Sequence, residues 1–262
     1  MKLEREGPIG ILTVDTVRSN AINLDFIHEA HALMDEAEQD GEIRALVVTS
    51  THRSLFCPGV DLPSLMGKSR GEMRAFYEAL TGIVRRKFGY PKPEVYALNG
   101  HAVAGGFMMA LAGEHRVMAQ GPFYVGLMEI ELGLTAPIGV VAMLEHVLGG
   151  RLAERVLFRG ERYTAEQALA LGLVDELVER DRLMDRALEH ARLLGSKPGA
   201  GYRRLKHYAR HAVVERMAAL DAGQLDDLVD RWFAEDTQKL VRTAVERMTS
   251  GKTAEAKGRG TA

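Results

Sequence analysis

The sequence predicts an α/β fold in which buried strands alternate with helices, followed by a purely helical C-terminal region. Up to about residue 180, apolar runs of strand length alternate with segments of helical period and with glycine turns. Beyond Lys197-Pro198-Gly199 the strand signals are few, and a helical stripe of apolar residues replaces them. We therefore expect a core over residues 1–197 and a helical region with a flexible tail over residues 198–262.

The elements of the core are expected in a regular order. Residues 9–14 form an apolar run that predicts the first strand, and residues 23–39 have the apolar spacing of an amphipathic helix. Residues 45–48 are apolar throughout, which is typical of a strand buried on both faces. A helix is expected over residues 71–87 and a strand over residues 95–98, with two prolines between them.

Composition and charge exclude several classes of protein. The 262 residues are 46% hydrophobic and 27% charged, which is ordinary for a soluble globular chain. The formal net charge of -2 gives no overall attraction to nucleic acid or anionic membranes, and no apolar run approaches the roughly 20 residues that span a bilayer. Cys57 is the sole cysteine, so no intrachain disulfide exists. We expect a cytoplasmic protein that binds neither nucleic acid nor membranes.

A local basic cluster lies over residues 203–210 despite the near-neutral total charge. We interpret this cluster as a solvated helix face, with RNA binding as the alternative.

Two loops offer backbone groups that can hold a negative charge. Gly105-Gly106 closes a turn after the strand over residues 95–98 and leads into an apolar helical segment, residues 107–112. Glycine lets a ligand approach the backbone closely, and the N–H groups at a helix start favour an anion. The loop over residues 58–61 offers a second N–H or is an ordinary turn. Two such donors converging on one point form an oxyanion hole.

Glu129 is the candidate proton-transfer group. Apolar residues surround it in the sequence, and burial there raises a carboxyl pKa toward the range useful near neutral pH. Glu131 points the same way if this segment is a strand, so the local pattern does not choose between the two, and an exposed glutamate without a catalytic role is the alternative. The histidines are scattered, so no metal site is expected. His101, beside the glycine turn, and Cys57 are expected to be structural.

Four segments, in this order, resemble the crotonase (enoyl-CoA hydratase/isomerase) superfamily. They are residues 19–23, 56–62, 99–106 and 165–174, and the similarity covers nearly the whole chain. The resemblance implies a spiral of ββα repeats, a C-terminal helical region used in trimerisation, and an acyl-CoA thioester as ligand. A homotrimer or a dimer of trimers is therefore expected. Coenzyme A is then part of the substrate, and the resemblance implies no separate cofactor and no metal ion.

The resemblance also assigns roles to individual residues. The oxyanion donors would be the backbone N–H groups of Val60 and Gly105. The CoA part of the ligand would lie near Ala21, Asp61 and Leu62, mostly against their backbone.

Hydratases of this superfamily carry two catalytic glutamates. The second corresponds to Glu129, whereas Met108 stands where the first would be, next to Gly106 in the expected substrate site. Adding water across a double bond normally uses both carboxylates, but one carboxylate suffices to move a proton from C2 to C4. Residues 126–137 and 233–239 resemble the mitochondrial-type Δ3,Δ2-enoyl-CoA isomerases, which also have an apolar residue at the Met108 position. The leading prediction is an enoyl-CoA isomerase of fatty-acid β-oxidation.

Three alternatives stay open on the sequence. The first is a hydratase. The second is a decarboxylase of a carboxyacyl thioester, for which His101 is the nearest contact for the departing carboxylate. The third is an acyl-CoA binder or scaffold without catalysis, which has no need of Glu129.

Overall fold

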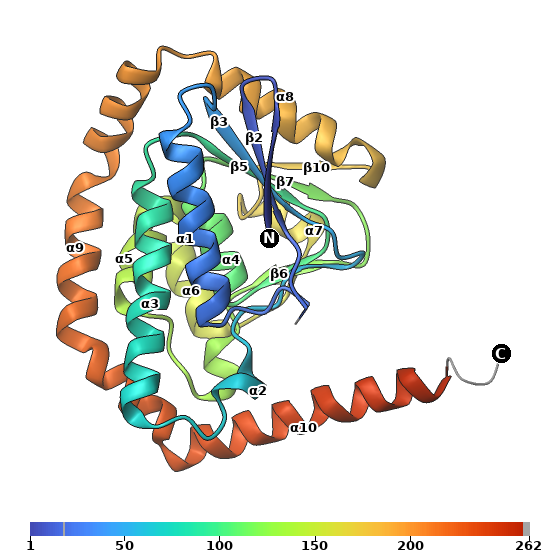
Figure 1. Ribbon diagram of the computed structural model, residues 1–262. Helices are drawn as coiled ribbons and strands as arrows, with labels where there is room; N and C mark the ends of the chain where they lie inside the picture. Colours follow the sequence, from blue (N-terminus) through green and yellow to red (C-terminus); the bar gives the residue numbers. More distant parts are fainter. Residues whose placement is uncertain (18, 259–262) are drawn as a thin grey trace.

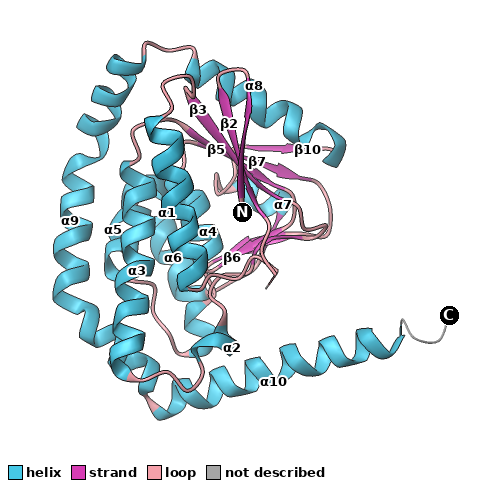
Figure 2. Cartoon of the chain, in the orientation of Figure 1, coloured by secondary structure: helices cyan, strands magenta, loops and turns pink. Residues whose placement is uncertain are grey.

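The computed structural model describes residues 1–17 and 19–258, with side chains described up to residue 250. Its strands are β1 (Lys2–Glu6), β2 (Ile9–Val14), β3 (Ala45–Ser50), β4 (Leu55–Cys57), β5 (Glu94–Leu98), β6 (His101–Val103), β7 (His115–Ala119), β8 (Tyr124–Gly126), β9 (Tyr163–Thr164) and β10 (Glu176–Val178). They form a six-stranded sheet in the order β1-β2-β3-β5-β7-β10 and a four-stranded sheet in the order β4-β6-β8-β9 (Figure 2).

Helices separate these strands along the chain. They are α1 (Leu24–Gln39), α2 (Leu62–Leu65), α3 (Arg70–Gly89), α4 (Gly105–Ala112), α5 (Ile138–Leu148), α6 (Gly150–Arg159), α7 (Ala165–Ala170), α8 (Leu183–Gly195), α9 (Gly199–Phe233) and α10 (Glu235–Gly258), with the 3-10 helices η1 (Glu129–Leu132) and η2 (Arg180–Arg182).

The predicted spiral of ββα repeats is confirmed. The strand pairs β3–β4, β5–β6 and β7–β8 each place their first strand in the large sheet and their second in the small sheet. A helical segment follows each pair before the chain returns to the large sheet. Within the large sheet the neighbours from β2 to β10 are parallel, and only β1 runs antiparallel to β2. In the small sheet β4 and β6 are parallel neighbours, so the loops that follow them emerge on the same side of the molecule.

Local sequence explains where the main elements begin. Every residue of β3 is buried, as its unbroken apolar run predicts. Helix α1 begins after Asn23, whose side chain accepts a hydrogen bond from the Phe26 N–H at 2.8 Å. Helix α3 begins after Ser69, which forms a capping box with Glu72.

A close backbone approach brings the two candidate loops together. A Cβ atom on Gly100 would lie 2.2 Å from the carbonyl carbon of Ser54, so no larger residue fits there. The His101 N–H donates to the Ser54 carbonyl at 2.9 Å, and the Asn99 side chain donates to the Ser50 carbonyl at 2.8 Å. These contacts hold β4 beside β6, so the loops after the two strands become neighbours.

The long helix α9 runs along the outside of the core and packs on α3 and α5 (Figure 1). Its inward side chains include Met217, Leu228 and Trp232, all buried. Asp221 of α9 also accepts a hydrogen bond at 3.0 Å from the Gly139 N–H, near the start of α5. The helical region therefore begins where the sequence predicts, whereas the division into two domains at residue 198 stays a prediction.

The basic cluster is not simply a solvated helix face. Lys206 is buried, and its Nζ lies 2.7 Å from the Glu114 carboxylate. Arg210 pairs with the same carboxylate at 2.9 Å and donates to the carbonyl groups of Phe88 and Ala112. The sequence interpretation was wrong for these two cations because their partner lies on a different element, far away in the sequence. They attach α9 to the core.

Helix α10 leaves the core and extends away from it (Figure 1). Its first turns contact α9, α2 and η1, and Thr237 and Val241 are buried there. The flexible tail expected at the C-terminus is helical as far as Gly258, and residues 259–262 lie outside the described residues. Among the described helices, none combines the length and apolar character needed to cross a bilayer.

Candidate active site

The turn before α4 has a strained backbone. Ala104, the N-cap residue, has φ 50° and ψ -132°, a combination that glycine adopts far more readily. Its N–H donates to the Gly126 carbonyl at 2.8 Å, and its own carbonyl accepts from Phe107 and Met108 at 2.9 Å. Within the described chain, the N–H groups of Gly105 and Gly106 have no acceptor. The turn therefore presents unpaired donors at the positive end of α4.

The loop after β4 presents a further unpaired donor. Gly59 has φ 89°, and its carbonyl accepts from the Ile22 N–H at 2.8 Å. The Asp61 N–H donates to the Ile22 carbonyl at 2.9 Å, so a short parallel bridge holds the loop on both sides of Val60. Among the described residues, nothing accepts from the Val60 N–H itself.

The two loops are in direct contact. A Cβ atom on Gly59 would lie 2.8 Å from the Ala104 Cβ and 3.4 Å from the Gly105 nitrogen. This closeness, together with the positive φ of Gly59, excludes any other residue there without rearrangement. The N–H groups of Val60 and Gly105 therefore lie on adjacent loops, as two convergent oxyanion donors require.

Cys57 supports the turn from behind. A Cβ atom on Gly106 would lie 2.5 Å from the Cys57 carbonyl oxygen and 2.8 Å from its Sγ atom. The Cys57 thiol is buried and donates to the Asn20 carbonyl at 3.1 Å. Burial raises the pKa of this thiol to about 12, so it stays protonated and unreactive at neutral pH. The structural role expected for Cys57 agrees with these contacts.

Asn20 is an organising residue that the sequence reasoning missed as an individual. Its backbone has φ 64°, and its side chain donates to the Ser50 hydroxyl at 2.8 Å and to the Phe56 carbonyl at 3.1 Å. These bonds connect the loop that precedes Ile22 to both β3 and β4. The available signal in the sequence was the asparagine itself, because asparagine adopts a positive φ more readily than most residues.

Glu129 begins the 3-10 helix η1 and is half-buried. Desolvation raises the pKa of its carboxyl group to about 7, although a backbone hydrogen bond opposes this effect. Gly133 ends η1 with φ 68°, and its carbonyl accepts from the buried Thr237 hydroxyl of α10 at 3.1 Å. Helix α10 thus holds the segment that carries Glu129.

Glu131 does not share the surroundings of Glu129. The segment is a 3-10 helix, not a strand, so residues two apart do not point the same way. Glu131 is exposed, and its side chain covers Gly160 at the end of α6, where an added Cβ would lie 3.5 Å from Oε1. The sequence left the conformation of this segment open, and the structure distinguishes two carboxylates that the local pattern left equivalent.

Tyr77 is a second residue that the sequence reasoning missed. It is buried on α3, and burial raises the pKa of its phenol, with the negative charge of Glu129 as a further cause. The phenol therefore lies within electrostatic range of the candidate base. Nothing in the sequence distinguishes Tyr77 from other apolar-face residues of a long helix.

The other expected substrate contacts lie on or near these loops. Ala21 immediately precedes Ile22, and Asp61 and Leu62 are buried at the start of α2. Met108 is buried in α4. The assignment of these residues to CoA or acyl binding stays a prediction.

His101 has the structural contacts expected of it. Its Nδ1 accepts from the Tyr124 N–H at 3.1 Å, and its ring packs against Phe123 and Tyr124. Burial, with Arg162 nearby, lowers the pKa of His101, so its imidazole is neutral near pH 7.

One group of potential metal ligands occurs at the start of β7. Donor atoms of His115, Glu176 and His190 lie within 4.8 Å of one another, which the scattered sequence positions did not indicate. The Glu176 carboxylate already accepts from Arg186 at 2.7 Å and contacts His190 at 2.7 Å. We interpret the group as an ion-pair network, away from the loops that follow β4 and β6.

Known proteins share this sequence and this fold. The sequence profile of the enoyl-CoA hydratase/isomerase family matches residues 4–250. Human mitochondrial enoyl-CoA delta isomerase 1 is 28% identical over 234 residues, which cover 89% of this chain and 78% of that protein. The short-chain-enoyl-CoA hydratase of Clostridium acetobutylicum is 30% identical over 190 residues, which cover 72% of each chain.

A solved structure agrees with these sequence relationships. The crystal structure of human mitochondrial Δ3,Δ2-enoyl-CoA isomerase superposes with a TM-score of 0.92 at 26% identity, covering 96% of this chain and 98% of that one. Sequence profile, relatives and fold agree. This chain belongs to the enoyl-CoA hydratase/isomerase family of the crotonase superfamily.

Proposed function

We propose that this protein is a Δ3,Δ2-enoyl-CoA isomerase that uses Glu129 as its single base. The observation that carries the proposal is the contrast between η1 and α4. Glu129 is a desolvated carboxylate with a pKa of about 7, whereas all eight residues of α4, Met108 included, are buried and not one is acidic or basic. Hydratases of this superfamily carry a second catalytic carboxylate at the position of Met108, whereas α4 has no carboxylate.

The reaction follows from these groups in two proton transfers. The Glu129 carboxylate removes a proton from C2 of a 3-enoyl-CoA, and the electron pair moves onto the thioester oxygen to form a dienolate. The N–H groups of Val60 and Gly105 hold the resulting negative charge. Glu129, now a carboxylic acid, returns the proton at C4, and the electrons move back to leave the conjugated 2-enoyl-CoA. No water is consumed, and Glu129 is restored.

The pKa of Glu129 suits both halves of this cycle. A group with a pKa near the working pH is an effective base in its charged form and an effective acid in its neutral form. An exposed glutamate, with a pKa near 4.3, is a much weaker base. The desolvation of Glu129 therefore supports its role as the one group that takes and returns the proton.

The remaining parts of the proposal follow from the resemblance to the superfamily. The CoA part lies against the backbone of Ala21, Asp61 and Leu62, and Gly106 and Met108 line the acyl site. Coenzyme A comes with the substrate, and the two proton transfers need no further cofactor and no metal ion. The assembly is a homotrimer or a dimer of trimers formed through the C-terminal helical region, and the compartment is the cytoplasm.

A hydratase is the second candidate, because the relatives include the Clostridium acetobutylicum hydratase at 30% identity. Hydration requires a second group that activates water or protonates C2. Tyr77 is a titratable side chain whose pKa the charge of Glu129 raises. A phenol with a raised pKa is a poor base at neutral pH, so isomerisation is the better supported reaction.

Replacing Glu129 with glutamine tests the base directly. Glu129→Gln keeps the size of the side chain but removes its basic oxygen, so kcat falls by about 10²–10⁴-fold. Acyl-CoA binding, measured by titration calorimetry, is retained. The matched variant Glu131→Gln stays near wild-type activity because that side chain is exposed and faces α6. Equal losses in both variants contradict the assignment of the base.

The pH profile tests the environment of Glu129. Its pKa of about 7 lies above that of an exposed glutamate, and the active form of the free enzyme is the charged one. Therefore kcat/KM for a 3-enoyl-CoA falls about tenfold per pH unit below that pKa and levels off above it. Initial rates between pH 5 and pH 9 measure this profile. A half-point near 4.5 shows that Glu129 is solvated, contrary to the account.

Removing one oxyanion donor tests the loop geometry. Gly105→Pro deletes the N–H at the first position of α4, where proline is otherwise compatible with a helix. Loss of one such donor lowers kcat by about 10²–10³-fold. Gly105→Ala is the matched control, because it adds the same Cβ, 3.0 Å from the Ile22 Cδ1 atom, but keeps the N–H. Melting temperatures of both variants check the fold, and equal activity refutes this donor.

A further inference from the structure

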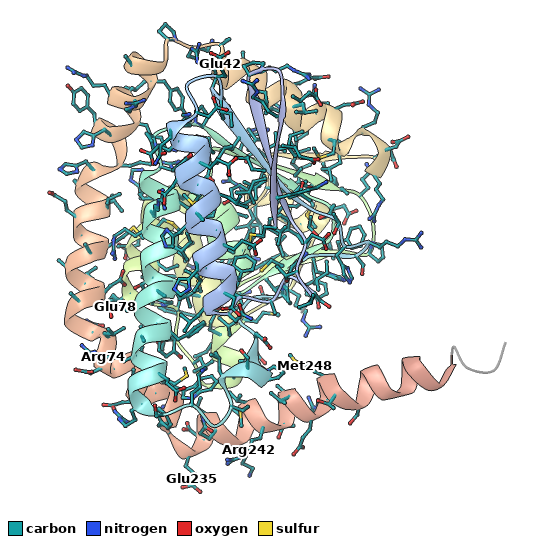
Figure 3. The ribbon with its side chains drawn as sticks, viewed as in Figure 1. Glu42, Arg74, Glu78, Glu235, Arg242 and Met248 are labelled. Atoms are coloured by element: carbon teal, nitrogen blue, oxygen red, sulfur yellow. The ribbon has the colours of Figure 1, made fainter. Side chains whose placement is uncertain are left out.

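A cavity of about 310 Å³ lies at the end of the strands opposite to the oxyanion loops. Ile43 and Arg44 line it just before β3, and Lys92 and Pro93 line it near the start of β5. The oxyanion loops belong to the same two repeats, but they follow the second strand of each pair, β4 and β6. At about 3.3 Å per residue, β3 and β5 alone separate the two places by roughly 15–20 Å. Figure 3 labels Glu42, next to Ile43 in the sequence, at the pole far from α10.

Cationic side chains dominate the walls of this cavity. Arg44, Lys92, Lys197 and Arg203 line it, and none of them forms an ion pair with a carboxylate in the described part of the chain. Glu38, the acidic residue of the lining, lies 3.6 Å from Arg86, which is outside the cavity.

The hydrogen bonds of these cations go to carbonyl groups. The Arg44 guanidinium donates to the Lys197 carbonyl at 2.9 Å. The Lys92 ammonium donates to the carbonyl groups of Ala37 and Asp40 at 2.5 Å and 2.7 Å. These bonds position the cations without neutralising their charge.

This lack of ion pairs contrasts with other cationic side chains of the protein. Arg186, Arg216 and Lys87, for example, lie within 3.0 Å of carboxylate oxygens. In the cavity, burial lowers the pKa of Lys92. The charges of Asp40 and Glu38 oppose this shift, and those of Arg203 and Arg44 add to it. With four cationic side chains and one acidic side chain in its lining, the cavity has an excess of positive charge.

The remaining walls add to this positive charge and supply apolar surface. The first turn of the 35-residue helix α9 forms part of the lining through Gly199 and Ala200, so the positive end of its dipole faces the cavity. Tyr202, Leu194 and Pro91 provide apolar contacts. The volume is at the lower end of the range for small-molecule sites.

We propose that this cavity is a binding site for a small phosphorylated organic molecule, separate from the acyl-CoA site. Its phosphate oxygens pair with Arg44, Lys92, Lys197 and Arg203, and its organic part packs on Tyr202 and Leu194. Arginine and lysine together are the usual partners of phosphate groups, and arginine binds two phosphate oxygens at once. A free nucleotide and the ADP part of coenzyme A share this chemistry, and the binding experiment separates them.

The test is titration calorimetry with ADP at low ionic strength, where screening is weak. The double variant Lys197→Gln/Arg203→Gln removes two exposed cations whose side chains form no hydrogen bond or ion pair with the described residues, so the fold is preserved. The control Lys239→Gln/Arg242→Gln removes two exposed cations from α10, where Figure 3 labels Arg242, and gives the same net charge. ADP affinity falls at least tenfold in the first variant and is unchanged in the second.

Saturation with hexanoyl-CoA distinguishes the two sites. ADP still binds the wild-type protein when the acyl-CoA site is full, and hexanoyl-CoA affinity is the same in both double variants. If hexanoyl-CoA abolishes ADP binding, or if the first variant binds ADP as the wild type does, the proposal is wrong. Neither result depends on the reaction at Glu129, so failure of the proposed isomerase leaves this test intact.

Discussion

The structure depends on one constraint: the backbone N–H groups of Val60, Gly105 and Gly106 stay without an acceptor in the described part of the chain, while the residues around them are held by hydrogen bonds. An unpaired buried donor costs about 1–3 kcal/mol, so a chain tolerates it only where the surroundings fix it in place. Here the bridge from Ile22 holds both sides of Val60, and the contact between Gly59 and Ala104 holds the second loop against the first. The spiral topology serves this constraint, because it delivers the loops after β4 and β6 to one place.

Two other features of the site also lower the stability of the folded protein. The backbone of Ala104 is strained, which typically costs about 1–3 kcal/mol. Burial of Glu129 raises its folded pKa above the unfolded value, so the charged form that catalysis needs destabilises the fold as pH rises through 7. In the proposed reaction, binding an enolate relieves the unpaired amides, and proton transfer neutralises the carboxylate. On this proposal, the features that cost stability in the free protein are those that favour the reacting state.

The sequence predicted elements whose causes are local. Apolar runs identified the main strands, and the glycine residues at positions 59 and 105 indicated the two loops that the structure places in contact. The failures have non-local causes. Lys206 was expected in solvent, but it pairs with Glu114. The sequence did not indicate this pair because Glu114 lies 92 positions earlier, as the two residue numbers show. The sequence left open whether the segment of Glu129 is a strand or a loop, whereas Gly133 and the distant Thr237 hold it as a 3-10 helix.

Parallel assays of the purified protein with 3-hexenoyl-CoA and 2-hexenoyl-CoA test the central claim most directly. The account predicts that the first substrate gives the conjugated thioester, and that hydration of the second is slower by orders of magnitude, because α4 provides no second carboxylate. Rapid hydration of 2-hexenoyl-CoA, with slow isomerisation of 3-hexenoyl-CoA, contradicts the single-base mechanism and assigns the site to water addition.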